Sequence, residues 1–253
     1  MAESTAGAGR RAPARTACTE RGRCRAAVRA VAANVSVPSH AGYQRLGATA
    51  THLLADARAT AVSAGPVLDA ALEAQSACTA IGLEACVIGG VALQRWGEPR
   101  FTADADLSVL VNAGDEPRVI AALLAKLAPR IDDAAGFALR TRVVLARSES
   151  GVGLDIVLGG LPFEARVIGR ASEWDLGDGS RLRTCSAEDL VVMKSFAGRD
   201  KDWADVTGVL ERQGNLLDLE LIRRELAPLV DAKEEPELAL ELERRIARIL
   251  GSV

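Results

Sequence analysis

Apolar and polar positions alternate with two different periods from residue 66 onward, and the periods predict the elements of the fold. Residues 67–81 and 112–127 place apolar side chains at helical spacing, so both are predicted helices. Short apolar runs at 85–88 and 104–111 predict buried strands. A glycine pair at 89–90 leads from the first of these strands into a further helix that runs through Trp96.

Two hairpins are predicted downstream, because pairs of β-prone segments flank short polar or glycine-rich turns. The first joins strands at 137–146 and 152–158, and the second joins strands at 172–176 and 181–185. From Ser186, a predicted N-cap, the pattern becomes helical to the end of the chain. The predicted helices cover about 187–197, 201–213, 218–230 and 235–250.

The resulting fold class is α/β, with a mixed β-sheet flanked by helices and followed by a helical unit. We expect an α/β domain over residues 67–185 and a C-terminal helical domain over 186–253. Residues 1–66 are expected to be an Ala/Arg-rich leader without a stable fold, because the first 40 residues contain few large apolar side chains. Residues 41–65 leave a weak helix open, and Gly65-Pro66 marks the expected boundary.

Composition and charge narrow the function classes. Apolar residues make up 49% of the 253 residues, which is enough for a sizeable core. The net charge of −3 divides into +5 over residues 1–40 and −8 over the rest, so the body of the protein offers no general electrostatic attraction for nucleic acid. No apolar run reaches the roughly 18 residues of a membrane span, and we expect no membrane partner.

Five cysteines are spread along the chain without any C-x-x-C pair. Their odd number and wide spacing argue against a disulfide framework and against structural zinc, and they predict a cytoplasmic protein. The cysteines are Cys18, Cys24, Cys78, Cys86 and Cys185.

Candidate chemistry gathers on the predicted strands. Asp104 and Asp106 share one face of a strand, because side chains alternate with period two. Asp155 is a single carboxylate in an otherwise apolar strand. Three such carboxylates suit divalent metal ions, but a solvated strand edge for the first two, and an ion pair of Asp155 with Arg140 or Arg142, are also open.

The glycine pair and one lysine add to this pattern. Gly89-Gly90 at the start of a helix suits phosphate binding, and it also suits an ordinary strand-to-helix turn. Lys194 lies on the same helical stripe as Leu190 and Met193. It either extends past the core to solvent or points into a cleft where it meets phosphate.

Taken together, a strand, Gly-Gly, a helix, Asp-x-Asp on a strand and a later lone Asp resemble the DNA polymerase β-like nucleotidyltransferase superfamily. The resemblance implies that the glycine turn helps to bind the phosphates of a nucleotide. It implies that Asp104 and Asp106 hold divalent metals, and that Asp155 completes the metal site and orients the attacking hydroxyl.

The resemblance narrows to the AbiEii/AbiGii toxin-type nucleotidyltransferases through Arg100-x-Thr102-x-Asp104-x-Asp106 and the stretch from Glu188 to Asp205. In such proteins a helix-borne lysine and a later aspartate belong to the active site. Lys194 matches the lysine, and Asp202 or Asp205 matches the aspartate. Arg100 and Thr102 either hold phosphate or fix the loop.

We therefore predict a metal-dependent nucleotidyltransferase that transfers a nucleoside monophosphate from an NTP to a hydroxyl of RNA or protein, with Mg²⁺ or Mn²⁺. The resemblance implies the toxin of a toxin–antitoxin system and a cognate antitoxin as partner. Alternatives are a small-molecule, aminoglycoside-type nucleotidyltransferase and a catalytically inactive interaction module. The catalytic residues are predicted to be Asp104, Asp106, Asp155 and Lys194. The other predicted nucleotide-binding residues are Gly89, Gly90, Arg100, Thr102, Arg199, Asp202 and Asp205.

Overall fold

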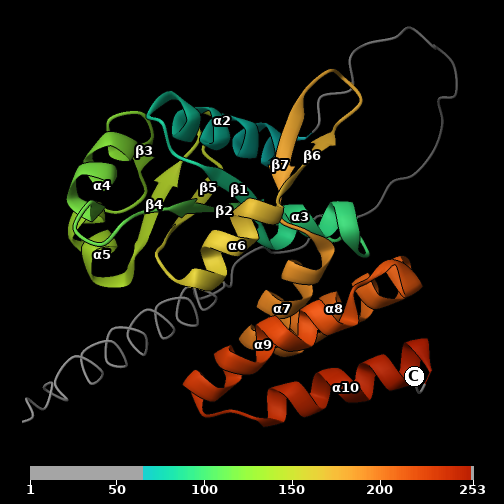
Figure 1. The fold of residues 1–253 in the computed structure, drawn as a ribbon. Helices are drawn as coiled ribbons and strands as arrows, with labels where there is room; N and C mark the ends of the chain where they lie inside the picture. The colour runs from blue at the N-terminus through green and yellow to red at the C-terminus, as the bar shows by residue number, and fades with distance from the viewer. Residues whose placement is uncertain (1–64, 252–253) are drawn as a thin grey trace, which may run out of the picture.

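A computed structural model describes residues 65–251, and the predictions for the leader, for Cys18 and for Cys24 lie outside this range. A mixed seven-stranded sheet runs through the described part of the chain in the order β3-β4-β5-β2-β1-β7-β6 (Figure 1). The strands are β1 (Ala85–Ile88), β2 (Asp104–Leu110), β3 (Ala128–Pro129), β4 (Val143–Arg147), β5 (Gly153–Gly159), β6 (Ser172–Asp175) and β7 (Arg181–Thr184).

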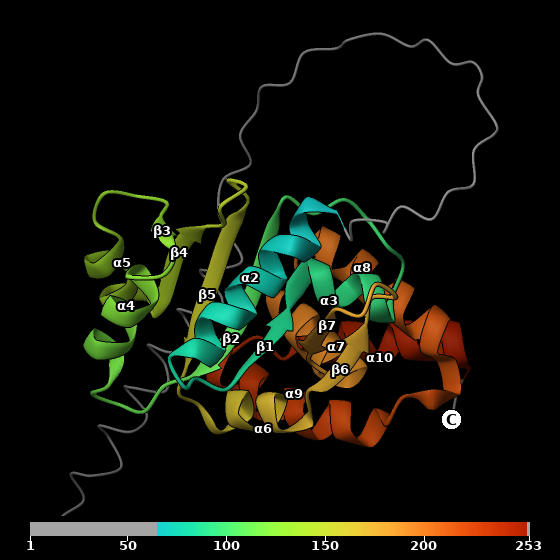
Figure 2. The same ribbon diagram turned by 90° about the horizontal axis from the view of Figure 1, so that it is seen from above.

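Helices cover both faces of this sheet, and the last helices gather on one side of it (Figures 1 and 2). The helices are α2 (Pro66–Ala80), α3 (Gly89–Trp96), α4 (Glu116–Leu124), α5 (Ala134–Thr141), α6 (Pro162–Arg170), α7 (Ala187–Ala197), α8 (Asp200–Gln213), α9 (Leu219–Lys233) and α10 (Glu237–Leu250), with a 3-10 turn η1 (Gly214–Leu216) between α8 and α9. The α/β fold class is as predicted, and the late helices occupy nearly the expected ranges. The division into three units stays a prediction.

Period-two alternation gives the central strands two different faces. Ala105, Leu107 and Val109 of β2 are buried in the core that α2 covers. Alternate residues of the same strand, Asp104 and Asp106, lie on the opposite face and line a cavity. Strand β5 repeats the arrangement beside it, with Leu154, Ile156 and Leu158 in the same core and Asp155 on the face that lines the cavity.

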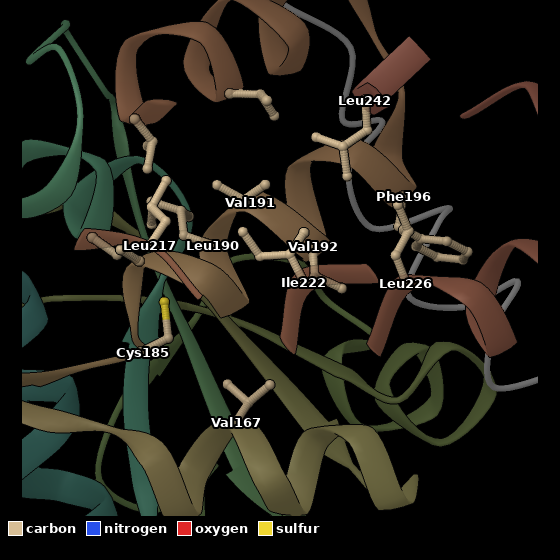
Figure 3. Packing of buried hydrophobic residues seen from close by; sticks show 14 of the residues in the cluster. Val167, Cys185, Leu190, Val191, Val192, Phe196, Leu217, Ile222, Leu226 and Leu242 are labelled. Carbon is tan, nitrogen blue, oxygen red and sulfur yellow. The ribbon is translucent and has the colours of Figure 1, made fainter. Parts of the chain in front are cut away.

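A second core lies on the cavity side of the sheet. Val167 of α6 and Cys185 at the end of β7 pack with Leu190 and Val191 of α7 in this core (Figure 3). Side chains of α8, α9 and α10 continue the same cluster. The helices after Ser186 are therefore packed against α3 and α6 on this side of the sheet.

One predicted strand is partly wrong. Residues 137–146 were expected to be extended, but Ala134–Thr141 form α5 and only Val143–Arg147 form β4. The Asp133 carboxylate accepts a hydrogen bond from the Gly136 N–H at the helix start, and Arg142 adopts a left-handed conformation at its end. These local caps close the helix, whereas an apolar run alone cannot separate a short helix from a strand.

The described chain has no helix that is both long enough and apolar enough to cross a bilayer. Its three cysteines, Cys78, Cys86 and Cys185, are buried free thiols.

Buried ion pairs connect the sheet side to the helical side. Arg170 of α6 contacts Asp189 of α7 at 2.5 Å and Glu225 of α9 at 3.1 Å. Asp189 also accepts a hydrogen bond from Ser186, the residue that caps α7. Because both carboxylates are nearly fully buried, each depends on arginines for compensation of charge, Asp189 on Arg170 and Glu225 on Arg166 together with Arg170.

We predict that Asp189→Ala destabilises the protein by about 3 kcal/mol, because it leaves Arg170 without one of its buried partners and removes the carboxylate that accepts a hydrogen bond from the Ser186 hydroxyl. Glu173→Ala is the matched control, since it breaks the Arg181–Glu173 pair, whose side chains are 61% and 65% exposed. That control should cost less than about 1 kcal/mol. Urea unfolding measures both, and equal losses for the two variants would contradict the account.

Candidate active site

Sheet register brings the three predicted carboxylates together. Strands β2 and β5 are parallel neighbours, and Asp106 lies directly opposite Asp155. Asp104, two residues earlier on β2, lies opposite Gly153 and on the same face. All three carboxylates line one cavity of about 260 Å³, just below the roughly 300–1,000 Å³ of ligand pockets.

The charge of this cluster is poorly compensated at Asp106. Burial and the neighbouring Asp155 raise the pKa of Asp106 to about 7, although Lys194 acts in the opposite direction. Burial also raises the pKa of Asp155, against the effect of a nearby arginine. Carboxylates that are crowded and partly desolvated in this way favour either a proton or a cation.

The glycine pair permits close packing around these carboxylates. Gly89 has a φ of 63°, and a Cβ at this position would overlap the carboxylate of Asp106. A Cβ at Gly90 would lie 2.5 Å from the Thr102 hydroxyl oxygen. Thr102 itself donates a hydrogen bond to the Asp104 carbonyl oxygen. The absence of a Cβ at both glycines thus allows β2 and its preceding loop to pack closely against the start of α3. The role of the glycines in phosphate binding stays a prediction.

The opposite wall of the cavity is rich in cations. Lys194 of α7 and Lys201 of α8 line it, together with Arg100 and Arg199. Partial burial and the neighbouring charges of Arg199 and Lys194 lower the pKa of Lys201, which shows how closely these cations are grouped. In Figure 1, α7 and α8 lie beneath the sheet, and the cavity is lined by residues of β2 and β5 as well as by residues of these two helices.

Two aspartates fix the cationic wall. Lys194 Nζ lies 3.2 Å from Asp202 Oδ1 and 2.8 Å from Asp205 Oδ2. Arg199 pairs with Asp202, and Arg100 makes two hydrogen bonds to Asp205, of 2.7 and 2.8 Å. Although burial acts to raise it, the Arg100 hydrogen bond and the Lys194 charge hold the pKa of Asp205 below its usual range.

Lys194 therefore does not extend past the core to solvent. Its side chain is 10% exposed and anchored by the two aspartates of α8. Arg100 fixes its loop to α8 through Asp205, which is one of the two roles that the sequence left open. The sequence left open whether Asp202 or Asp205 is the aspartate that accompanies Lys194. In the structure both aspartates form ion pairs with Lys194.

The proposed ion-pair partners of Asp155 were wrong. Arg140 pairs with Asp133, and Arg142 pairs with Glu116. Both arginines belong to the α5 segment that the sequence interpreted as strand. Instead, Nη2 of Arg130 lies 2.5 Å from Asp155 Oδ1. Arg130 follows the two-residue strand β3 and belongs to no motif, so only tertiary structure could identify it.

The sequence patterns did not identify Phe101, an exposed aromatic residue beside the cavity. The Phe101 side chain is 87% exposed, and its neighbours Arg100 and Thr102 both line the cavity. Within residues 65–251, it is the one aromatic residue classed as exposed. The flat apolar ring of Phe101 is therefore accessible to solvent, next in sequence to two residues that line the cavity.

Comparisons with known proteins identify a family and two structures with partial similarity. The model of a family described as "Nucleotidyl transferase AbiEii toxin, Type IV TA system" matches residues 75–250. None of the curated proteins compared with the chain matches it. Structural similarity is found to an antigenic nucleotidyltransferase-like protein from Paracoccidioides brasiliensis, at 15% identity and a TM-score of 0.41, over 73% of this chain and 96% of that one. The antibiotic-resistance factor ANT(2'')-Ia is similar at 18% identity and a TM-score of 0.40, over 68% of this chain and 93% of its own.

The raised pKa of Asp106 makes a prediction for stability. Because the pKa lies near 7 in the folded protein, against 3.8 for an unperturbed carboxyl, ionisation of Asp106 costs stability as the pH rises from about 4 to above 7. Asp106→Asn removes this cost. In metal-free buffer the variant should be more stable than the wild type at pH 8, by at most about 4 kcal/mol, and nearly equal to it at pH 4.

Thermal unfolding in the presence of a chelator, over this pH range, measures the difference. The exposed Glu211→Gln on α8 serves as the control, and its difference from the wild type should not depend on pH. A variant that is less stable than the wild type at pH 8 would refute the electrostatic interpretation of Asp106.

Proposed function

The chain belongs to the AbiEii nucleotidyl transferase toxin family and is a nucleotidyltransferase; from this premise we propose that it transfers a nucleoside monophosphate from an NTP to a hydroxyl of RNA or protein, with Mg²⁺ or Mn²⁺. The observation that supports this most directly is one cavity with two walls of opposite charge. Asp104, Asp106 and Asp155 stand on one wall, and Lys194 and Arg199 stand on the other. A metal–triphosphate complex needs carboxylates to bind the metal ion and cationic side chains to bind the phosphates.

The donor set fits a divalent cation by its chemistry. Hard cations such as Mg²⁺ take oxygen ligands, and the three aspartates offer carboxylates on one face of two adjacent strands. Burial and the neighbouring Asp155 raise the pKa of Asp106, so its ionised carboxylate would be stabilised by a cation bound beside it. When bound, the metal would stabilise negative charge on the attacking and leaving oxygens. Asp104, Asp106 and Asp155 would hold it.

The remaining steps depend on the chain's own side chains. Lys194 and Arg199 would bind the phosphate oxygens, with Asp202 and Asp205 holding Lys194 in place. Asp155 would orient the acceptor hydroxyl toward the α-phosphorus. The hydroxyl oxygen forms a bond to that phosphorus, the bond to the bridging oxygen breaks, pyrophosphate leaves, and the hydroxyl proton passes to solvent.

The family also suggests a biological role. Its description names a toxin of a type IV toxin–antitoxin system, and we propose that this chain has a cognate antitoxin and acts in the cytoplasm. The exposed Phe101 ring beside the cavity wall favours an acceptor with aromatic groups, such as the bases of RNA, because aromatic side chains stack on bases.

Asp104→Ala is the variant that tests the proposal most cleanly. The Asp104 side chain is 50% exposed, and the one ion pair that it makes within residues 65–251, with Arg130, is 3.6 Å long, so its removal should leave the fold intact. Transfer of α-phosphate label from each NTP to total RNA and protein should fall by about a hundredfold or more, because a metal ligand contributes several kcal/mol to the transition state. The exposed Glu211→Ala should transfer label like the wild type.

Other outcomes would favour the alternatives. Label that appears on an aminoglycoside and not on RNA or protein would indicate a small-molecule enzyme. Equal transfer by the wild type and Asp104→Ala would remove Asp104 from the site. Failure of the wild type to transfer any of the four labelled NTPs would favour an inactive member of the family.

A further inference from the structure

Arg130 places a positive charge between two of the three carboxylates. Its Nη2 lies 2.5 Å from Asp155 Oδ1, and its Nη1 lies 3.6 Å from Asp104 Oδ1. We propose that Arg130 is an internal counterion of the metal-binding carboxylates, and that its guanidinium must leave them when a divalent cation binds. This inference rests on the proposed function, because it assumes that the carboxylates are metal ligands.

Burial makes the contact with Asp155 a strong one. The side chains of Arg130 and Asp155 are 15% and 6% exposed, so the pair is largely shielded from water. The Asp104 side chain is 50% exposed, and its contact with Arg130 is longer. A buried carboxylate that loses its partner pays the full cost of desolvation, so Arg130 compensates Asp155 in the free protein.

The surrounding backbone is shaped around this contact. The Arg130 N–H donates a hydrogen bond to the Leu145 carbonyl oxygen, which continues the pairing of β3 with β4. Gly153 lies opposite Asp104 across the two strands. A Cβ at Gly153 would lie 2.6 Å from Arg130 Nη1 and would overlap the Asp104 carboxylate. A glycine at this strand position thus leaves room for the guanidinium and the carboxylate together.

The paired state and the metal-bound state compete for the same oxygen. Asp155 Oδ1 already accepts a charge-assisted hydrogen bond, and a divalent cation beside it would repel the guanidinium. Among residues 65–251, no three acidic, histidine or cysteine side chains are already arranged around one ion position, so Asp104, Asp106 and Asp155 would have to shift together as Arg130 leaves and the metal binds. Arg130 would therefore lower the affinity for free metal and would favour metal that arrives with a triphosphate, whose contacts to Lys194 and Arg199 add binding energy.

Calorimetric titration of the full chain with Mn²⁺, without nucleotide, tests this directly. Arg130→Gln should bind Mn²⁺ about tenfold more tightly than the wild type, because the competing charge-assisted contact is gone. Arg147→Gln is the matched control. It removes one positive charge from the end of β4, opposite Gly153, where Arg147 is bonded to a backbone carbonyl and not to a carboxylate. Its affinity should stay within about twofold of the wild type.

Arg130→Lys covers the case in which Arg130→Gln fails to fold. A lysine keeps the charge but lacks the two-pronged guanidinium, so we expect a smaller gain of about threefold in Mn²⁺ affinity. A purely structural role would predict the opposite, since a disordered Asp155 would bind metal less well. Equal or weaker Mn²⁺ binding by folded Arg130 variants, with measurable binding to the wild type, overturns the inference and leaves the proposed function standing.

Loss of Mn²⁺ binding in Asp104→Ala shows that the measured ion occupies the carboxylate cluster. If neither the wild type nor any Arg130 variant binds Mn²⁺, the metal assignment fails, and the counterion inference fails with it. Binding that is detectable only after Arg130 is replaced supports the inference in its strongest form.

Discussion

Repulsion between carboxylates on one face of the sheet is the constraint on which the rest of the site depends. Parallel pairing of β2 with β5 sets Asp106 directly opposite Asp155, and Asp104 follows on the same face. Placing three acids there is costly unless positive charge lies close by. Arg130 supplies such charge from the β3 side, and Lys194 supplies it from α7 across the cavity. The sheet and the helices are thus joined by electrostatics as well as by their shared apolar core.

The cationic wall shows how the helical part of the chain completes the site. Lys194 cannot be moved independently of Asp202 and Asp205, because all three are buried and paired with one another. Arg100 then connects Asp205 to the loop that carries Thr102. A change in the packing of α7 and α8 would therefore be transmitted to the loop before β2. Lys194 acts as a structural residue of this network as much as a candidate ligand of phosphate, so its replacement should cost stability.

Much of this could be predicted from the sequence where local patterns decide the outcome. The Asp-x-Asp spacing predicts a shared strand face, and Gly89-Gly90 begin the helix α3 that was expected after the first strand. Prediction failed where a local cap that the apolar pattern does not reveal, or a tertiary contact, decides the outcome. Residues 137–141 form a helix because Asp133 caps it, and Asp155 pairs with Arg130 because β3 brings that arginine to the sheet edge. Neither contact produces a periodic pattern in the sequence. The register between β2 and β5 also leaves no such pattern, so it could not be predicted.

The central claim is that one cavity binds metal on its carboxylate wall and triphosphate on its cationic wall. Anomalous X-ray diffraction from crystals grown with Mn²⁺ and a non-hydrolysable NTP tests it most directly. The account predicts manganese peaks beside Asp104, Asp106 and Asp155, with phosphates directed toward Lys194 and Arg199. Manganese that binds elsewhere, or a nucleotide whose phosphates point away from α7 and α8, would contradict it.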